Sequence, residues 1–155
     1  MGVNYKLFLP GEIDVKKLEI FLTEADNYAI PPLSVLVNIK DYAVKLAEKA
    51  TIFAAIDKSR IVGVSAVYVN KAPMFSYATY LCALKPYQND MVGIELVMKS
   101  IDYCKAYGSA SYRGEIRKAN KPLWNFYKRI GFKIVEEKVY PNSDTQSLII
   151  ELNYK

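Results

Sequence analysis

Residues 51–84 constrain the fold more than any other part of this chain. Three runs have the length and the β-branched, apolar composition of strands, namely Thr51–Ile56, Ile61–Val69 and Phe75–Leu84. They are separated only by the short polar or turn-forming stretches Asp57–Arg60 and Asn70–Pro73. Because gaps this short join antiparallel neighbours, the sequence predicts an antiparallel meander of three strands.

The pattern that follows the meander predicts a parallel strand pair. A helix is expected from about Met91 to Tyr107, since its apolar residues recur at helical spacing and Gly108 can end it. A strand over Ser111–Arg117 comes next. A strand, a helix and a second strand in this order form a crossover unit. Phe75–Leu84 and Ser111–Arg117 should therefore lie parallel in one sheet.

The remaining elements complete a mixed fold. The sequence predicts strand Tyr5–Leu9, a helix capped by Asp14, a helix starting near Asp41, a short helix after Asn120, and strands Phe132–Tyr140 and Ser147–Leu152. Pro31 and Pro32 predict a loop over Asp26–Leu36. The expected class is α+β with α/β/α layers: a mainly antiparallel sheet of about seven strands and about four helices. No repeat or linker appears, so residues 1–155 should form a single domain.

The composition restricts the chemistry. The chain has no histidine, which excludes Ser-His and Cys-His catalysis and every histidine-ligated metal. Cys82 and Cys104 are far apart in apolar surroundings, so we expect buried thiols, with neither a disulfide nor a metal site. A general base would have to be Glu, Asp, Tyr, Lys or a water molecule held by polar groups.

Charge and hydropathy indicate the kind of partner and the location. The net charge is +5, but the basic residues are scattered and are densest between Arg113 and Arg129. This favours a small anionic ligand over a nucleic-acid track. No apolar run approaches the roughly 20 residues of a membrane helix, and the start of the chain lacks the pattern of a signal peptide. We expect a cytoplasmic protein with no membrane partner.

The stretch from Asn120 to Phe132 predicts a short helix with defined ends. Asn120 can cap it, Pro122 lies in the first turn where a missing N–H costs nothing, and Gly131 can end it in a left-handed conformation. Tyr127 lies on the apolar face of this helix. Packing is therefore one role for Tyr127, and chemistry is the alternative.

Together with the order of elements, two motifs make the whole chain resemble the GNAT superfamily of N-acetyltransferases. The family's phosphate loop is Arg or Gln, two residues, Gly, one residue, then Gly or Ala. Here Gln88 and Gly93 fit, while Met91 replaces the first Gly. The family's second motif is an Asn followed by a Tyr and a Gly-Phe pair. It matches Asn120, Tyr127 and Gly131–Phe132.

The resemblance implies transfer of an acetyl group from acetyl-CoA to a primary amine. Backbone N–H groups at the start of the long helix would bind the pyrophosphate, and the strand before it would pair with pantetheine. The implied coenzyme residues are Leu81, Cys82, Ala83, Gln88, Asn89, Asp90, Met91, Val92, Gly93, Ile94 and Asn120, with Tyr127. Tyr127 would give its proton to the departing thiolate. A left-handed Met91 would be strained by about 1–2 kcal/mol, equivalent to about tenfold in affinity.

The base and the acceptor are less defined. Glu115 and Tyr80 are candidate bases, but Glu115 could instead pair with a nearby arginine and Tyr80 could belong to the core. Proximity alone could also supply the acceleration without an essential base. The acceptor should meet the loops Asp26–Lys40 and Tyr140–Gln146. The acceptor wall is expected to contain Tyr28, Pro31 and Pro32.

The stretch Ile30–Ser34 resembles a bacterial small-molecule subgroup of the family, which suggests an amino sugar as acceptor. Protein N-termini, polyamines and aminoglycosides remain open, as does a homodimer formed through the last strand pair. The alternative to an enzyme is a catalytically weak or inactive acyl-CoA-binding module with a degenerate phosphate loop. Met91 and Asn89 favour that module, whereas Tyr127 and Asn120 favour catalysis.

Overall fold

The computed structural model describes residues 2–28, 31–141 and 145–154, and it confirms the predicted fold class. Within these residues seven strands form one sheet in the order β1-β2-β3-β4-β5-β7-β6. Strands β4 and β5 are parallel, and the other registered pairs are antiparallel. The elements are β1 (Asn4–Phe8), α1 (Val15–Glu24), the 3-10 helix η1 (Asp26–Tyr28), α2 (Leu33–Leu36), α3 (Ile39–Lys49), β2 (Thr51–Asp57), β3 (Arg60–Tyr68), β4 (Ser76–Ala83), α4 (Lys85–Gln88), α5 (Val92–Tyr107), β5 (Ser111–Arg117), α6 (Lys121–Arg129), β6 (Lys133–Val139) and β7 (Gln146–Asn153).

The chain divides into two compact units, and each is discontinuous in sequence. The first unit contains Met1–Tyr68 and Tyr80–Asp102, and the second contains Val69–Thr79 and Tyr103–Lys155. Strand β4 and helix α5 contribute residues to both units. The two units are described separately.

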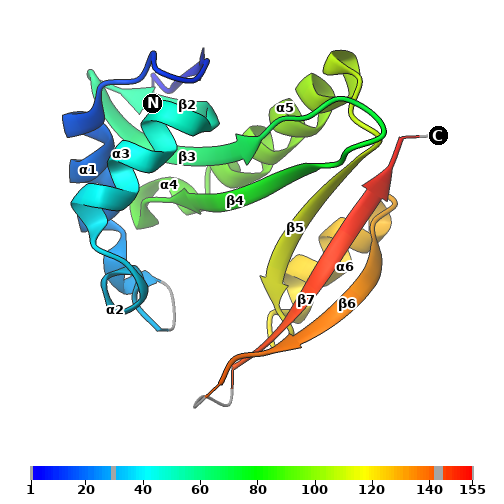
Figure 1. Cartoon of the computed structure of the whole chain (residues 1–155). Helices are drawn as coiled ribbons and strands as arrows, with labels where there is room; N and C mark the ends of the chain where they lie inside the picture. Colours follow the sequence, from blue (N-terminus) through cyan, green and yellow to red (C-terminus); the bar gives the residue numbers. More distant parts are fainter. Residues whose placement is uncertain (1, 29–30, 142–144, 155) are drawn as a thin grey trace. The chain divides into compact units, whose positions relative to one another are not determined.

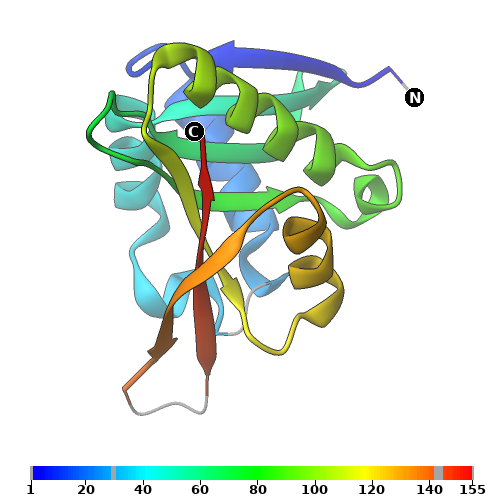
Figure 2. The same cartoon turned by 90° about the vertical axis from the view of Figure 1, so that its right-hand side faces the viewer.

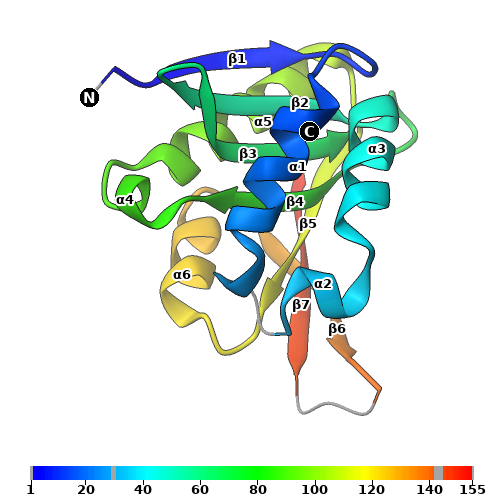
Figure 3. The ribbon, with the colours of Figure 1, turned by 90° about the vertical axis from the view of Figure 1, so that its left-hand side faces the viewer.

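In the first unit, helices cover both faces of the antiparallel strands β1–β3. Helices α1 and α3 lie on one face, and the start of α5 lies on the other (Figures 1 and 3). The core is apolar, and Leu18, Leu22, Leu46, Ile52 and Val64 are completely buried. Burial of a side chain of this size stabilises the fold by about 1.5–3 kcal/mol.

A glycine lets the start of α5 approach the sheet closely. A Cβ atom on Gly63 of β3 would lie 2.9 Å from Cγ1 of Val92 and 3.0 Å from Cδ1 of Leu96. Contacts this short between carbon atoms are repulsive, so a larger residue would push α5 away. Gly63 therefore allows the first turn of α5, which follows the predicted phosphate loop, to pack closely on β3.

In the second unit, β5 pairs with β7, and β7 pairs with β6. The first residues of β4 add to this sheet in parallel, with Ser76 opposite Tyr112. Helix α6 lies beside the β5–β7–β6 strands (Figure 2). Aromatic rings contribute to the core of the second unit, where Tyr112 and Phe132 make an edge-to-face contact with centroids 6.0 Å apart.

Several predicted boundaries were wrong. Helix α3 begins at Ile39 and not near Asp41, because the Oδ1 atom of Asn38 caps it by accepting from the Asp41 N–H at 3.0 Å. The segment Asp26–Leu36 is more than a loop, since it contains η1 and α2. Pro32 is compatible with α2 because it occupies the N-cap position and not the interior.

Two expectations fall partly outside the described residues. Ile30 of the stretch Ile30–Ser34 is one of them, and residues 142–144 of the loop Tyr140–Gln146 are the other. Within the described ranges there are six α-helices and one 3-10 helix, against about four helices expected. None of the described helices has both the length and the hydropathy needed to cross a membrane.

Candidate active site

The predicted pantetheine segment, Leu81–Ala83, lies at the end of β4 in the first unit. The chain then turns through α4, which is held against the strand end by a side chain. Nε2 of Gln88 donates a hydrogen bond to the Ala83 carbonyl oxygen at 2.9 Å, and the Leu84 N–H donates to the Val62 carbonyl oxygen at 2.9 Å. The structure thus joins Gln88 to the pantetheine segment. Its predicted contact with the coenzyme stays a prediction.

Met91 adopts the left-handed conformation that glycine adopts readily and other residues do not. Its φ angle is +59°, and its side chain is 57% exposed. A Cβ atom in this region costs about 1–2 kcal/mol. Because the folded protein holds this conformation, the strain reduces folding stability.

The residues after Met91 begin α5 with free backbone donors, which suit an anion. The first backbone hydrogen bond of α5 joins the Glu95 N–H to the Met91 carbonyl oxygen at 3.0 Å. The N–H groups of Val92, Gly93 and Ile94 precede it and have no acceptor within the helix. Such groups, at the positive end of the helix dipole, suit a phosphate or pyrophosphate.

Two carboxylates lie near this helix end and oppose the binding of an anion there. Burial, then Glu95 and Asp90, raise the pKa of Tyr5, which places both negative charges within electrostatic range of that ring. Glu95 is partly neutralised by Lys99, whose Nζ atom lies 3.8 Å from the carboxylate on the exposed surface. The start of α5 therefore offers backbone N–H donors to an anion, but the negative charges of Asp90 and Glu95 weaken the electrostatic attraction.

Tyr80 is poorly suited to act as a base. Its ring makes edge-to-face contacts with Phe21 and Tyr42, each with centroids 6.4 Å apart. Burial, together with the neighbouring Cys82 thiol, raises the pKa of Tyr80 well above its ordinary value. A phenolate is the form that accepts a proton, and these surroundings disfavour it. The contacts agree with the alternative that Tyr80 belongs to the core.

The predicted acceptor wall, Tyr28, Pro31 and Pro32, is linked to the rest of the first unit through contacts of Tyr28. The Tyr28 hydroxyl accepts a hydrogen bond from the Lys85 N–H at 3.1 Å, and Nζ of Lys85 lies 5.3 Å from the Tyr28 ring centroid. The Asp26 carboxylate accepts from both the N–H and the hydroxyl of Ser34, at 2.7 and 2.6 Å. Pro31 and Pro32 are half-buried. Tyr28 therefore joins this segment to the start of α4.

In the second unit, α6 holds Tyr127 in a buried aromatic setting. The side chain is 6% exposed, and its ring lies against Phe126 and Phe132 with centroids 5.4 and 5.0 Å apart. Burial raises the pKa of Tyr127 to about 12. The hydroxyl consequently keeps its proton throughout the physiological range.

The ends of α6 follow the sequence prediction. Oδ1 of Asn120 accepts from the Leu123 N–H at 3.3 Å, which is an N-cap. Gly131 has a φ angle of +109°, and the Phe132 N–H returns to the Tyr127 carbonyl oxygen at 3.0 Å. The motif thus fixes the helix turn that holds Tyr127. The contact of Asn120 with a coenzyme stays a prediction.

Glu115 lies on β5 inside a cluster of donors. The Tyr140 hydroxyl donates to its Oε2 atom, the Arg117 guanidinium lies 3.2 Å from the same oxygen, and Nζ of Lys138 lies 3.9 Å from Oε1. The structure thus shows the arginine pairing that was the alternative to a base. The two hydrogen bonds to Oε2 leave fewer lone pairs for a substrate amine.

The strand register explains this cluster, most of which the sequence did not reveal. Arg117 and Lys138 both lie opposite Ser147, on the two sides of β7. The Arg117 guanidinium also donates to the Ser147 hydroxyl at 2.8 Å. The signal in the sequence was charge at alternating positions of β5 and a run of charges at residues 136–138 of β6, but it becomes interpretable only once the register of the three strands is known.

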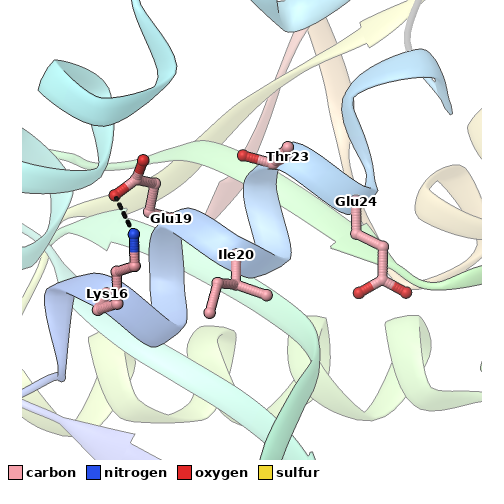
Figure 4. Close-up of a pocket in the computed structure, with 5 residues that line it drawn as sticks. All are labelled: Lys16, Glu19, Ile20, Thr23 and Glu24. Carbon is pink, nitrogen blue, oxygen red and sulfur yellow. Dashed lines mark ion pairs between the residues drawn. The ribbon is translucent and has the colours of Figure 1, made fainter.

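No metal centre is found among the described residues, because no three His, Cys, Asp or Glu side chains gather there. Both cysteines are free thiols; Cys104 is buried and Cys82 is half-buried. A hollow on the exposed side of α1 is lined by Lys16, Glu19, Ile20, Thr23 and Glu24 (Figure 4). It contains none of the predicted site residues.

A family model for the acetyltransferase (GNAT) family matches residues 18–132, which include both motifs. The chain belongs to the GNAT family of acetyltransferases. Members of this family transfer an acetyl group from acetyl-CoA, so acetyl-CoA-dependent N-acetyl transfer is the activity of this chain's family. None of the curated protein sequences matches the chain.

Solved structures of other proteins with the same fold have low sequence identity to this GNAT protein. The ribosomal-protein-S18-alanine N-acetyltransferase of Escherichia coli superposes with a TM-score of 0.77 at 17% identity, over 97% of this chain and 94% of that one. Ard1 of Thermoplasma volcanium gives 0.73 at 17% identity, over 99% and 98%. A putative streptothricin acetyltransferase of Bacillus anthracis, in complex with acetyl coenzyme A, gives 0.58 at 22% identity, over 69% and 64%. At these identities the likeness establishes the fold.

Proposed function

We propose that this protein acetylates a primary amine of a small molecule, using acetyl-CoA and Tyr127 as the group that protonates the departing thiolate. The observation that carries the proposal is the setting of Tyr127. It is buried, and its pKa is raised to about 12 by that burial, so the hydroxyl is protonated at any working pH. It is also held at a defined position by the Asn120 cap and the Gly131 turn.

The chain's own groups divide the work as follows. N–H groups at the start of α5 bind the pyrophosphate, and the backbone of Leu81–Ala83 aligns the pantetheine. The Tyr127 hydroxyl donates to the sulfur as negative charge develops there. A phenol with a pKa near 12 is a weak acid, so its contribution should lie at the lower end of general acid catalysis, about 100-fold in kcat.

For the acceptor we propose a neutral or weakly basic amine, with an amino sugar as the first candidate. Neither of the two candidate bases is well suited to the task, since Tyr80 is disfavoured by burial and Glu115 is already engaged by Arg117, Lys138 and Tyr140. An amine that is partly unprotonated near neutral pH needs less help from the protein. Amino sugars have such amines, whereas polyamines are largely charged.

The experiment is a panel of amines assayed by release of free thiol from acetyl-CoA. It should contain amino sugars, aminoglycosides, polyamines and peptides with a free N-terminus. The peptides are included because a protein of this fold acts on the alanine of a ribosomal protein. Turnover with amino sugars that falls about 100-fold in Tyr127→Phe would support both parts of the proposal. Activity on peptides alone would refute the small-molecule acceptor, and unchanged turnover in Tyr127→Phe would refute the acid role.

The second candidate is a binding module with little or no turnover. The observations that favour it are the carboxylates of Asp90 and Glu95 beside the phosphate loop. Titration calorimetry with acetyl-CoA separates the two. Binding at micromolar to sub-millimolar concentration without turnover on any amine would select the module, and no binding at all would reject both.

A further inference from the structure

Tyr87, which the mechanism above does not use, is the strongest candidate for a further role. We propose that Tyr87 is a positioning residue for the coenzyme pyrophosphate. Its hydroxyl, anchored on Asp57, holds the turn Asn89–Met91 in the form that aims the first N–H groups of α5 at the ligand. The proposal rests on acetyl-CoA binding as proposed above, and every residue in it lies in the first unit.

The anchor is a buried, charge-assisted hydrogen bond. The Tyr87 hydroxyl donates to Oδ2 of Asp57 at 2.6 Å, and the two residues are only 7% and 8% exposed. Asp57 is the last residue of β2, and its buried carboxylate needs such a donor. Arg60 also hydrogen-bonds with Tyr87, and Arg60 pairs with Glu24 of α1 at 3.1 Å. The anchor therefore ties α4 to a strand and a helix of the core.

The backbone of Tyr87 supports the turn directly. Its carbonyl oxygen accepts from the Asn89 N–H and, at 3.2 Å, from the Asp90 N–H. A shift of Tyr87 must therefore move the residues that lead into α5. Through its side chain, Tyr87 is linked to the ends of two core strands, to Asp57 of β2 and to Arg60 of β3.

The far end of the turn is fixed as well. Val92, the first residue of α5, is 1% exposed and packs where a Cβ atom on Gly63 would clash. Only four residues, Gln88, Asn89, Asp90 and Met91, separate the two fixed ends, Tyr87 and Val92. This short span accounts for the left-handed Met91, whose φ angle is +59°. The strain at Met91 is the consequence of two anchored ends, and release of one end should let it relax.

The first test removes only the hydroxyl, with Tyr87→Phe. We expect the dissociation constant of acetyl-CoA to rise about tenfold by calorimetry, because a bond to a buried carboxylate is lost and the turn relaxes. Hydrogen exchange should become faster at the amides of Asp90 and Glu95, whose hydrogen bonds lie on either side of the free N–H groups. Tyr107→Phe is the matched control, since it deletes the same atom from a tyrosine that is 43% exposed and outside the site.

A second ligand separates positioning from general damage. Acetyl-pantetheine carries the thioester arm but no pyrophosphate, so its binding, followed by NMR titration, should be the same in Tyr87→Phe and in the wild type. A merely structural role would weaken both ligands. The double variant Tyr87→Phe with Met91→Gly should recover most of the lost acetyl-CoA affinity, because glycine keeps the left-handed turn without the anchor.

The outcomes are decisive in each direction. If Tyr87→Phe binds acetyl-CoA as tightly as the wild type does, the role of Tyr87 is refuted while the proposed function stands. An equal loss of affinity for acetyl-CoA and acetyl-pantetheine would have the same consequence. Absence of wild-type binding would reject the proposed function together with the coenzyme role of Tyr87. Asp57→Asn, which keeps an acceptor of similar shape but no charge, should show a smaller loss of the same kind; a gain in affinity would contradict the anchor.

Discussion

Replacement of Met91 by glycine should stabilise the folded protein while leaving its affinity for acetyl-CoA within about twofold of the wild type. Met91 has a φ angle of +59° in the folded protein, so its strain is part of the folded state. Relief of that strain is worth about 1–2 kcal/mol. The left-handed turn is kept in the variant, and the donors that follow it stay in place.

Opposing effects reduce the expected gain. Glycine makes the unfolded chain more flexible, which costs about 0.4–1 kcal/mol. Loss of the methionine side chain costs little, because that side chain is 57% exposed. The net stabilisation is therefore about 0.5–1 kcal/mol, and for a chain of this length it should raise Tm by about 1–4 °C.

Urea unfolding at fixed pH, checked by calorimetric Tm, measures the stability, and titration calorimetry measures the affinity. Met91→Ala is the control, since it removes the same exposed side chain but retains the Cβ atom that causes the strain. We expect Met91→Ala to show no stabilisation. Destabilisation by Met91→Gly, or equal stabilisation by both variants, would refute the strain argument. A tenfold tighter complex with Met91→Gly would show that the strain is borne on binding.

Three further predictions concern the second unit. Because burial raises the pKa of Tyr127 from 10.0 to about 12, the folded state holds this proton more tightly than the unfolded state. Stability from this group should therefore be complete below pH 10 and fall by about 2–3 kcal/mol as pH rises to 12, a loss that urea titrations should show to be smaller in Tyr127→Phe. Asn120→Ala removes the cap on the Leu123 N–H and should cost about 1 kcal/mol in urea unfolding; a cost near zero would mean that the cap is dispensable. Gly131→Ala combines a φ angle of +109° with a Cβ atom 3.2 Å from Cδ1 of Leu152, and should lower Tm by more than Asn120→Ala; an unchanged Tm would contradict the strained turn.

The parts of the site that depend on neighbouring residues were predictable from the sequence. Asn120, Tyr127 and Gly131 lie within one helix and its two ends, so capping and glycine rules were enough to define the motif. The fold class followed from the changes in apolar period and from the short turns. The strain at Met91 was also predictable in part, because Met91 replaces a glycine of the family's loop and would be strained in a left-handed conformation.

The parts that depend on pairing between distant segments were not predictable. The hydrogen bond from Tyr87 to Asp57 joins residues 30 positions apart, and nothing in either local sequence indicates it. The donors around Glu115 gather only because β5, β7 and β6 have a particular register. Helices α2 and α4 are each one turn long, which is too short for an apolar period to reveal them.

The left-handed Met91 changes how the departure from the family's phosphate loop should be weighed. A missing glycine suggests an eroded site if the loop must distort when the coenzyme arrives. Here the distortion is already present, held between the Tyr87 anchor and the contact of Val92 beneath Gly63. Met91 is therefore weak evidence for a binding module without turnover. The charges of Asp90 and Glu95 are the stronger argument, because they act on the ligand itself and no backbone rearrangement removes them. They should reduce affinity while leaving the Tyr127 hydroxyl untouched, since Tyr127 lies on a separate helix, α6. Under the proposed function, a loop that binds weakly and a Tyr127 that keeps its proton would give an enzyme with a high KM for acetyl-CoA.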